Sequence, residues 1–159
     1  MIISRSLISE ICNQLREQGK SIVFTNGCFD ILHVGHVTYL EAAKQLGDVL
    51  IVGVNSDDSV RRLKGPSRPI NNESDRSAVL SALKAVDFTV IFDEDTPLEL
   101  IEELTPHVIT KGGDYTPETI VGAEYVRQHG GKVIVIPLVA GKSTTSILKR
   151  QGEKGRGES

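Results

Sequence analysis

The stretch Ile22-Val23-Phe24-Thr25-Asn26-Gly27-Cys28-Phe29-Asp30-Ile31-Leu32-His33-Val34-Gly35-His36 decides the fold of this chain. The apolar run at residues 22–24 predicts a short buried strand, and a turn rich in polar residues and glycine follows it. Apolar residues at helical spacing across residues 34–46 then predict a helix. A strand that leads through such a turn into a helix places the helix N-terminus, with its unpaired N–H groups, where α/β proteins bind phosphate.

The remainder of the chain alternates strand-like and helix-like segments in the same way. Short apolar runs predict four more strands, at residues 49–54, 88–92, 108–110 and 133–136. Helical spacing of apolar residues predicts further helices at residues 8–15, 76–85, 97–104, 117–129 and 143–150. Strands separated by helices favour a parallel sheet with right-handed crossovers. We therefore predict an α/β fold with a five-stranded parallel sheet and helices on both faces.

The chain is organised as one domain, because it contains no internal repeat and no linker. Residues 1–150 are predicted to form this single domain. Residues 151–159 lack apolar side chains and are predicted to be a disordered tail. In the predicted helix at 76–85, Val79, Leu80 and Leu83 are expected to face the core.

Composition narrows the classes of partner and location. The 159 residues carry a net charge of −3, so no global positive field favours a nucleic-acid partner. The two cysteines, Cys12 and Cys28, form no CxxC pattern, which argues against a zinc site and a disulfide framework. Reduced thiols favour a cytoplasmic location. No signal peptide and no apolar run of membrane-spanning length is present, so no membrane partner is expected.

The carboxyl ends of the predicted strands are the candidate positions for a ligand, since parallel α/β sheets bind ligands at that edge. The segments that follow four of the strands, at residues 25–36, 55–58, 110–115 and 137–145, all contain polar residues or glycine. Asp30, three residues before His33, could cap the turn that opens the helix or orient the second imidazole. Two glycines after the fourth strand, Gly112 and Gly113, permit close approach of a ligand to the backbone.

Parts of these motifs are also compatible with other kinds of site. Gly141-Lys142-Ser143-Thr144 resembles the end of a P-loop, but the glycine required five residues earlier is replaced by Ile136. No GxGxxG follows the first strand, so a dinucleotide fingerprint is absent. His33 and His36 could instead bind a metal, although no HExxH pattern accompanies them, or could be a purely structural pair.

Two separate motifs resemble those of the HxGH nucleotidyltransferase superfamily. The first is the run from Thr25 to His36, and the second is Ser143-Thr144-Thr145-Ser146-Ile147 near the other end of the chain. The superfamily includes cytidylyltransferases and adenylyltransferases. The resemblance implies a Rossmann-like form of the predicted fold, a nucleotidyltransferase domain at residues 1–150, and catalysis with Mg²⁺ carried mainly by ATP, without a firm protein ligand for the metal.

Further segments resemble the branch that makes ADP-heptose for bacterial lipopolysaccharide. They are Arg62-Leu63-Lys64-Gly65, Ser67-Arg68-Pro69, Ala85-Val86-Asp87 and Lys111-Gly112-Gly113-Asp114-Tyr115. This resemblance implies adenylyl transfer from ATP to heptose 1-phosphate by a stand-alone form that works with a separate sugar kinase, and it implies a homodimer. The alternatives are a cytidylyltransferase for glycerol 3-phosphate or a phosphorylated amino alcohol, and a regulatory nucleotide-binding module. Retention of both histidines argues against the regulatory module.

The resemblance, together with the motif chemistry, assigns roles to individual residues. The catalytic residues are predicted to be His33, His36 and Lys64, which would stabilise charge on the phosphates. The residues predicted to bind the nucleotide are Thr25, Asn26, Gly27, Phe29, Gly35, His36, Lys111, Gly113, Asp114, Ser143, Thr144 and Thr145. The residues predicted to bind the acceptor substrate are Asp30, Arg68 and Asp114. Arg76 is interpreted as a surface charge or as a brace for the loop before it.

Overall fold

Six parallel strands form a single sheet in the computed structural model, which describes residues 1–113 and 115–137. Their order across the sheet is β1-β4-β3-β2-β5-β6. The strands are β1 (Ile2–Ile3), β2 (Ile22–Gly27), β3 (Val49–Asn55), β4 (Phe88–Phe92), β5 (Val108–Gly112) and β6 (Lys132–Ile136). The predicted α/β fold with a parallel sheet is confirmed, and its five predicted strands are β2 to β6.

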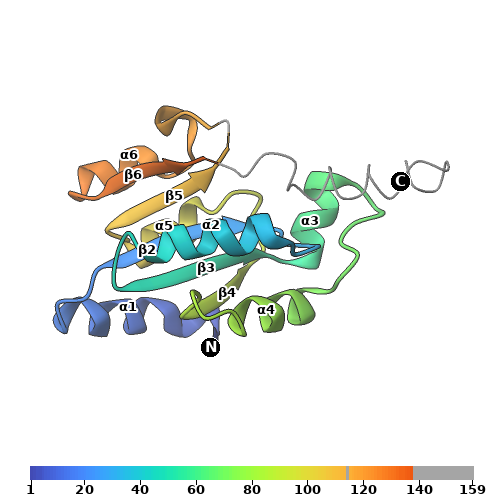
Figure 1. Ribbon diagram of the computed structural model, residues 1–159, viewed down its shortest axis with the longest axis horizontal. Coiled ribbons are helices and arrows are strands. Elements are labelled where there is room, and N and C mark those ends of the chain that lie inside the picture. Colours follow the sequence, from blue (N-terminus) through green and yellow to red (C-terminus); the bar gives the residue numbers. More distant parts are fainter. Residues whose placement is uncertain (114, 138–159) are drawn as a thin grey trace.

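Helices cover both faces of this sheet (Figure 1). One face packs against α1 (Ile8–Glu17), α5 (Leu98–Leu104) and α6 (Ala123–Gln128), and the other packs against α2 (Val34–Lys44) and α4 (Glu73–Ser81). Alternation along β2 explains the two layers, because Ile22 and Phe24 belong to the first cluster and Val23 to the second. Helix α3 (Asp57–Lys64) follows β3 directly, and the short 3₁₀ turns η1 (Arg5–Leu7) and η2 (Pro117–Thr119) complete the described elements.

The strand order reverses between the neighbouring strands β2 and β5. From β2 the chain proceeds to β3 and β4 on one side, and it then returns to β5 and β6 on the other. Strand β2 pairs with β3 from Ile22↔Val49 to Gly27↔Val54, and with β5 at Val23↔Val108. The carboxyl ends of β2 and β5 therefore form the topological switch point, where ligands bind in open α/β sheets.

Several predicted elements differ from those observed. Strand β1 was not predicted, because two residues at an edge show no periodicity. Helix α3 was not predicted either, although Ser56 caps it and accepts a hydrogen bond from the N–H of Ser59. The helix predicted at 76–85 is α4, which begins earlier because Asn72 caps it. Val79 was expected in the core, but it is 51 % exposed, so that prediction is wrong.

The segment predicted as one helix at 117–129 is divided into η2 and the shorter α6. Gly122, which has a φ of 88°, separates the two. The helix predicted at 143–150 and the tail predicted at 151–159 lie outside the described residues. Within the residues that the structure describes, no helix combines the length and the apolar character needed to cross a membrane.

Candidate functional site

The two histidines of the HxGH motif form the amino end of α2. His33 is the N-cap, and its Nδ1 accepts a hydrogen bond from the N–H of Gly35 at 3.0 Å. The N–H of His33 in turn donates to Nδ1 of His36 at 3.3 Å, which completes a capping box. Because both Nδ1 atoms accept, each neutral ring carries its proton on Nε2. The local geometry thus prepares two N–H donors beside a helix N-terminus.

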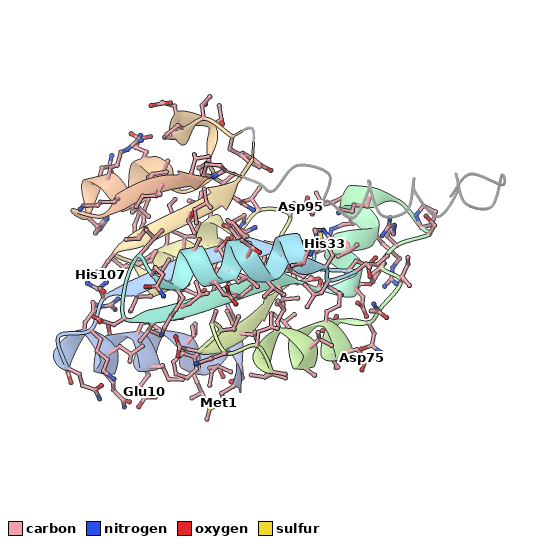
Figure 2. The ribbon with its side chains drawn as sticks, in the orientation of Figure 1. Met1, Glu10, His33, Asp75, Asp95 and His107 are labelled. Atoms are coloured by element: carbon pink, nitrogen blue, oxygen red, sulfur yellow. The ribbon has the colours of Figure 1, made fainter. Side chains whose placement is uncertain are left out.

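His36 is neutral at physiological pH. Burial, together with smaller electrostatic contributions from His33 and Lys64, lowers its pKa to about 4. The rings of His33 and His36 lie 4.0 Å apart between centroids. Figure 2 shows His33 at the opposite end of the sheet from His107, which precedes β5. The pair therefore stands at the carboxyl edge, where the sequence predicts the site.

Phe29 occupies a position that links the turn to His36. Its φ is +50°, in the left-handed region that side chains other than glycine rarely adopt. The buried ring meets the His36 ring edge-on, with 5.6 Å between centroids. A Cβ on Gly27 would lie 2.9 Å from the Phe29 ring. Gly27, predicted to admit a nucleotide, is thus also required for the packing of Phe29.

Asp30 joins the loop after β2 to the loop that connects α3 and α4 (residues 65–72, the α3–α4 loop). It is 6 % exposed, and its carboxylate accepts hydrogen bonds from the N–H groups of Ile70 and Asn71. Arg68 Nη1 donates to the same carboxylate at 3.0 Å. Burial alone raises the pKa of Asp30, but the Asn71, Ile70 and Arg68 donors outweigh it and hold that pKa below its ordinary value.

These contacts revise the interpretation of Asp30. The cap of α2 is His33, so the expectation that Asp30 caps the turn opening the helix is wrong. Asp30 and Arg68, both predicted to bind the acceptor substrate, form an ion pair with each other, with Arg68 partly exposed and Asp30 buried. A direct contact of either residue with substrate stays a prediction.

Lys111 connects the end of β5 to the end of β2. Its Nζ donates to the backbone oxygen of Asn26 at 2.9 Å and lies 5.7 Å from the centroid of the Tyr115 ring. Burial lowers the pKa of Lys111 to about 8, against a smaller opposing effect of Cys28. Among the described residues, no carboxylate forms a salt bridge with Lys111. A partly buried cation at the switch point is a suitable ligand for phosphate.

The other predicted residues fall into three groups. Thr25 is 1 % exposed, and its hydroxyl already contacts the Tyr39 hydroxyl at 2.7 Å and the Thr110 carbonyl at 3.1 Å, so a nucleotide contact stays a prediction. Lys64 is the last residue of α3, and its exposed side chain contributes to the lowered pKa of His36. Outside the described residues lie Asp114, Ser143, Thr144 and Thr145.

Arg76 is the residue whose importance the sequence did not reveal. It is 2 % exposed, which excludes the interpretation as a surface charge and agrees with the alternative of a brace. Arg76 is the fourth residue of α4, and nothing in the sequence around it indicates that a basic side chain there is buried.

Within residues 1–113 and 115–137, no group of three or more histidine, cysteine or carboxylate side chains could hold a metal ion.

Comparisons with known proteins agree with this geometry. The sequence profile of the family described as cytidylyltransferase-like matches residues 24–148. The bifunctional protein HldE of Syntrophotalea carbinolica is 56 % identical over 146 residues, which are 92 % of this chain and 30 % of that protein. HldE of Geobacter metallireducens is 58 % identical over 135 residues, which are 85 % of this chain and 28 % of that protein. This chain thus spans less than a third of the length of these relatives.

Two solved structures are similar to the fold. The lipopolysaccharide core biosynthesis protein of Thermoplasma volcanium superposes with a TM-score of 0.61 at 35 % identity, over 76 % of this chain and 98 % of that one. Pantoate-beta-alanine ligase of Francisella tularensis gives 0.64 at 17 % identity, over 94 % of this chain and 72 % of that one, which supports the fold alone. The capped histidine pair at the switch point and the match over residues 24–148 lead to one conclusion: the chain belongs to the cytidylyltransferase-like family, the HxGH nucleotidyltransferases.

Proposed function

We propose that this chain transfers the adenylyl group of ATP to a sugar 1-phosphate, releasing pyrophosphate. The observation that carries the proposal is the pair His33 and His36, whose Nδ1 atoms are both occupied by backbone N–H groups. This arrangement presents Nε2–H donors to an anion at the switch point. The heptose acceptor rests on the resemblance of residues 62–65, 67–69, 85–87 and 111–115 to the ADP-heptose branch. The name of the Thermoplasma relative, a lipopolysaccharide core biosynthesis protein, supports that acceptor.

The reaction is a single displacement at phosphorus. A phosphate oxygen of the sugar 1-phosphate attacks the α-phosphorus of ATP, and the bond from this phosphorus to the bridging oxygen breaks as pyrophosphate leaves. The protein forms no covalent bond in this scheme, so its tasks are to align two anions and to stabilise the developing charge. His33 and His36 donate to α-phosphate oxygens, and Lys64 and Lys111 supply positive charge at the same edge of the sheet.

Mg²⁺ enters this scheme with the nucleotide, as MgATP. The described residues contain no cluster that could hold the ion, so they do not fit a metal bound by the protein alone. The remaining nucleotide contacts are proposed for the backbone at Gly27, Phe29 and Gly35, and for Gly113 after β5. The predicted contacts of Asp114, Ser143, Thr144 and Thr145 are retained as part of the proposal.

The proposal includes two partners and a location. Leu63, Ile70 and Val79 are each about half exposed, at 52 %, 57 % and 51 %, and we propose that a second copy of the chain covers them in a homodimer. Sedimentation of the protein as a monomer at micromolar concentration would contradict the dimer.

We propose that a separate sugar kinase supplies the sugar phosphate, in the cytoplasm. A strain that lacks this kinase is expected to contain no ADP-sugar, and continued formation of the ADP-sugar there would contradict this step.

A pyrophosphate-release screen tests the function. The protein is offered ATP, CTP, GTP and UTP with Mg²⁺, each combined with heptose 1-phosphate, glycerol 3-phosphate and ethanolamine phosphate. We expect release above background only with ATP and heptose 1-phosphate, and a loss of roughly 100- to 1,000-fold in kcat for His36→Ala. The exposed His129, substituted by Ala, is the control and keeps full activity. Turnover with CTP and glycerol 3-phosphate, but not with ATP and heptose 1-phosphate, contradicts the proposal.

A further inference from the structure

Arg76 connects three segments that meet at the carboxyl edge of the sheet. Its Nη1 donates to the backbone oxygens of Cys28 and Asn55, each at 2.7 Å. Its Nε donates to the backbone oxygen of Asn71 at 2.9 Å. Its Nη2 donates to the Asp57 carboxylate at 2.8 Å, which balances the charge of the guanidinium. One buried side chain thus joins the ends of β2 and β3 to the α3–α4 loop.

Two of these acceptors are carbonyl groups at the ends of central strands. β2 ends at Gly27 and β3 at Asn55, so the oxygens of Cys28 and Asn55 lie at the limit of the strand pairing. A buried carbonyl that lacks a donor is costly, and Nη1 of the guanidinium supplies one N–H to each of these two oxygens. The two strand ends are therefore held together by Arg76 at the point where the loop toward His33 begins.

The loop between β2 and α2 (residues 28–33) is held from two sides. Arg76 fixes the carbonyl of Cys28, and the N–H and side-chain amide of Asn71 donate to the carboxylate and the backbone oxygen of Asp30. Asn71 itself accepts from Arg76. Between these two anchors lies Phe29, whose ring contacts His36. A shift of the Cys28 carbonyl would thus be passed to the histidine pair through one residue.

We propose that Arg76 is a positioning residue for the transfer reaction, because it fixes the loop at residues 28–33 on which His33 and His36 depend. The inference rests on the proposed function for its activity readout. Arg76 does not touch substrate, since its side chain is 1 % exposed. Lysine is a poor replacement, because a single ammonium cannot reproduce the planar fork that reaches four acceptors. A displacement of about 1 Å in a catalytic group can reduce the rate about 100-fold.

The test compares Arg76→Met and Arg76→Lys with a matched control, Arg16→Met. The Arg16 guanidinium also donates to two backbone oxygens, of Leu104 at 2.6 Å and Thr105 at 3.2 Å, but these lie at the end of α5 that precedes β5, at the opposite edge of the sheet from the site. All variants are expected to lose thermal stability. Only the Arg76 variants are expected to lose kcat, by 10- to 100-fold, with a change of less than about threefold in KM for the nucleotide. Assays are run below each Tm, and folding is checked by circular dichroism.

A second readout is independent of turnover. The ¹⁵N resonances of the His36 ring are titrated in the full chain. Arg76→Lys and Arg76→Met are expected to move the midpoint upward toward an ordinary histidine value, and Arg16→Met is expected to leave it unchanged. Wild-type kcat and an unchanged midpoint in Arg76→Lys overturn the inference, as does an equal loss of kcat in Arg16→Met. If wild type turns over no substrate pair, the proposed function fails, and the titration still decides the role of Arg76.

Discussion

His33 and His36 contact each other in two ways, through a hydrogen bond from the backbone of His33 and through their rings. The N–H of His33 donates to Nδ1 of His36 at 3.3 Å, and the ring centroids are 4.0 Å apart. His33 therefore serves two purposes, because the ring that caps α2 is also a proposed phosphate donor. Substitutions can separate these purposes.

Replacement of His33 by Ala and by Asn separates capping from catalysis. His33→Ala removes the acceptor for the N–H of Gly35 and is expected to lower the free energy of unfolding by about 1 kcal/mol. His33→Asn supplies a new cap acceptor and is expected to restore most of that stability. Both variants are expected to lose roughly 100- to 1,000-fold in kcat, measured by pyrophosphate release. Full activity in His33→Asn would show that the residue is only a cap.

Stability is expected to fall between pH 6.5 and pH 4, because of His36. Its folded pKa of about 4 lies below the ordinary value of 6.5. Above pH 6.5 the ring is neutral in both states, whereas at lower pH the unfolded chain binds a proton that the folded chain does not. Allowing for solvent screening, the loss from pH 7 to pH 5 is about 1 kcal/mol. Urea unfolding of wild type and His36→Gln measures it, and identical pH dependence in the two proteins contradicts the assignment.

Asp30 is expected to hold the α3–α4 loop in place. Asp30→Asn removes the charge that Arg68 and the N–H groups of Ile70 and Asn71 contact, which is expected to cost roughly 1.5–3 kcal/mol. Hydrogen exchange is expected to accelerate at residues 65–72. The matched control is Asp48→Asn, since Asp48 also accepts from a backbone N–H, that of Ser21, but on an exposed surface. Equal effects of the two substitutions would show that burial of Asp30 is unimportant.

Lys111 is expected to take up a proton when MgATP binds near pH 8. Burial leaves its pKa at about 8, so about half of the side chains are neutral there. An adjacent phosphate favours the ammonium form and raises that pKa. Calorimetry in buffers of different ionisation enthalpy is expected to detect uptake of up to about half a proton at pH 8 and close to none from Lys111 at pH 6. The same uptake in Lys111→Met would place the proton elsewhere.

The sequence predicted the sheet better than the ends of the helices. Strands β2 to β6 were found because buried parallel strands are continuous apolar runs, as in residues 49–54. Helix α3 was missed because five of its residues are charged, and only Val60 and Leu63 are apolar. Val79 was placed in the core by spacing alone, yet α4 turns it outward. The ends of helices depend on capping residues such as Asn72, and a single residue in the sequence is a weak indication of where a helix begins.

By itself, the sequence determined the α/β class, the position of the histidine pair at the start of a helix, and the family. These features follow from spacing along the chain, since strand and helix periods and the HxGH motif are local. Only the tertiary structure decided the partners of Asp30, which lie 40 and 41 residues away, and the burial of Arg76. A carboxylate or a guanidinium binds whichever donor or acceptor the packing of β2, β3 and α4 brings to it, and no local pattern specifies that neighbour.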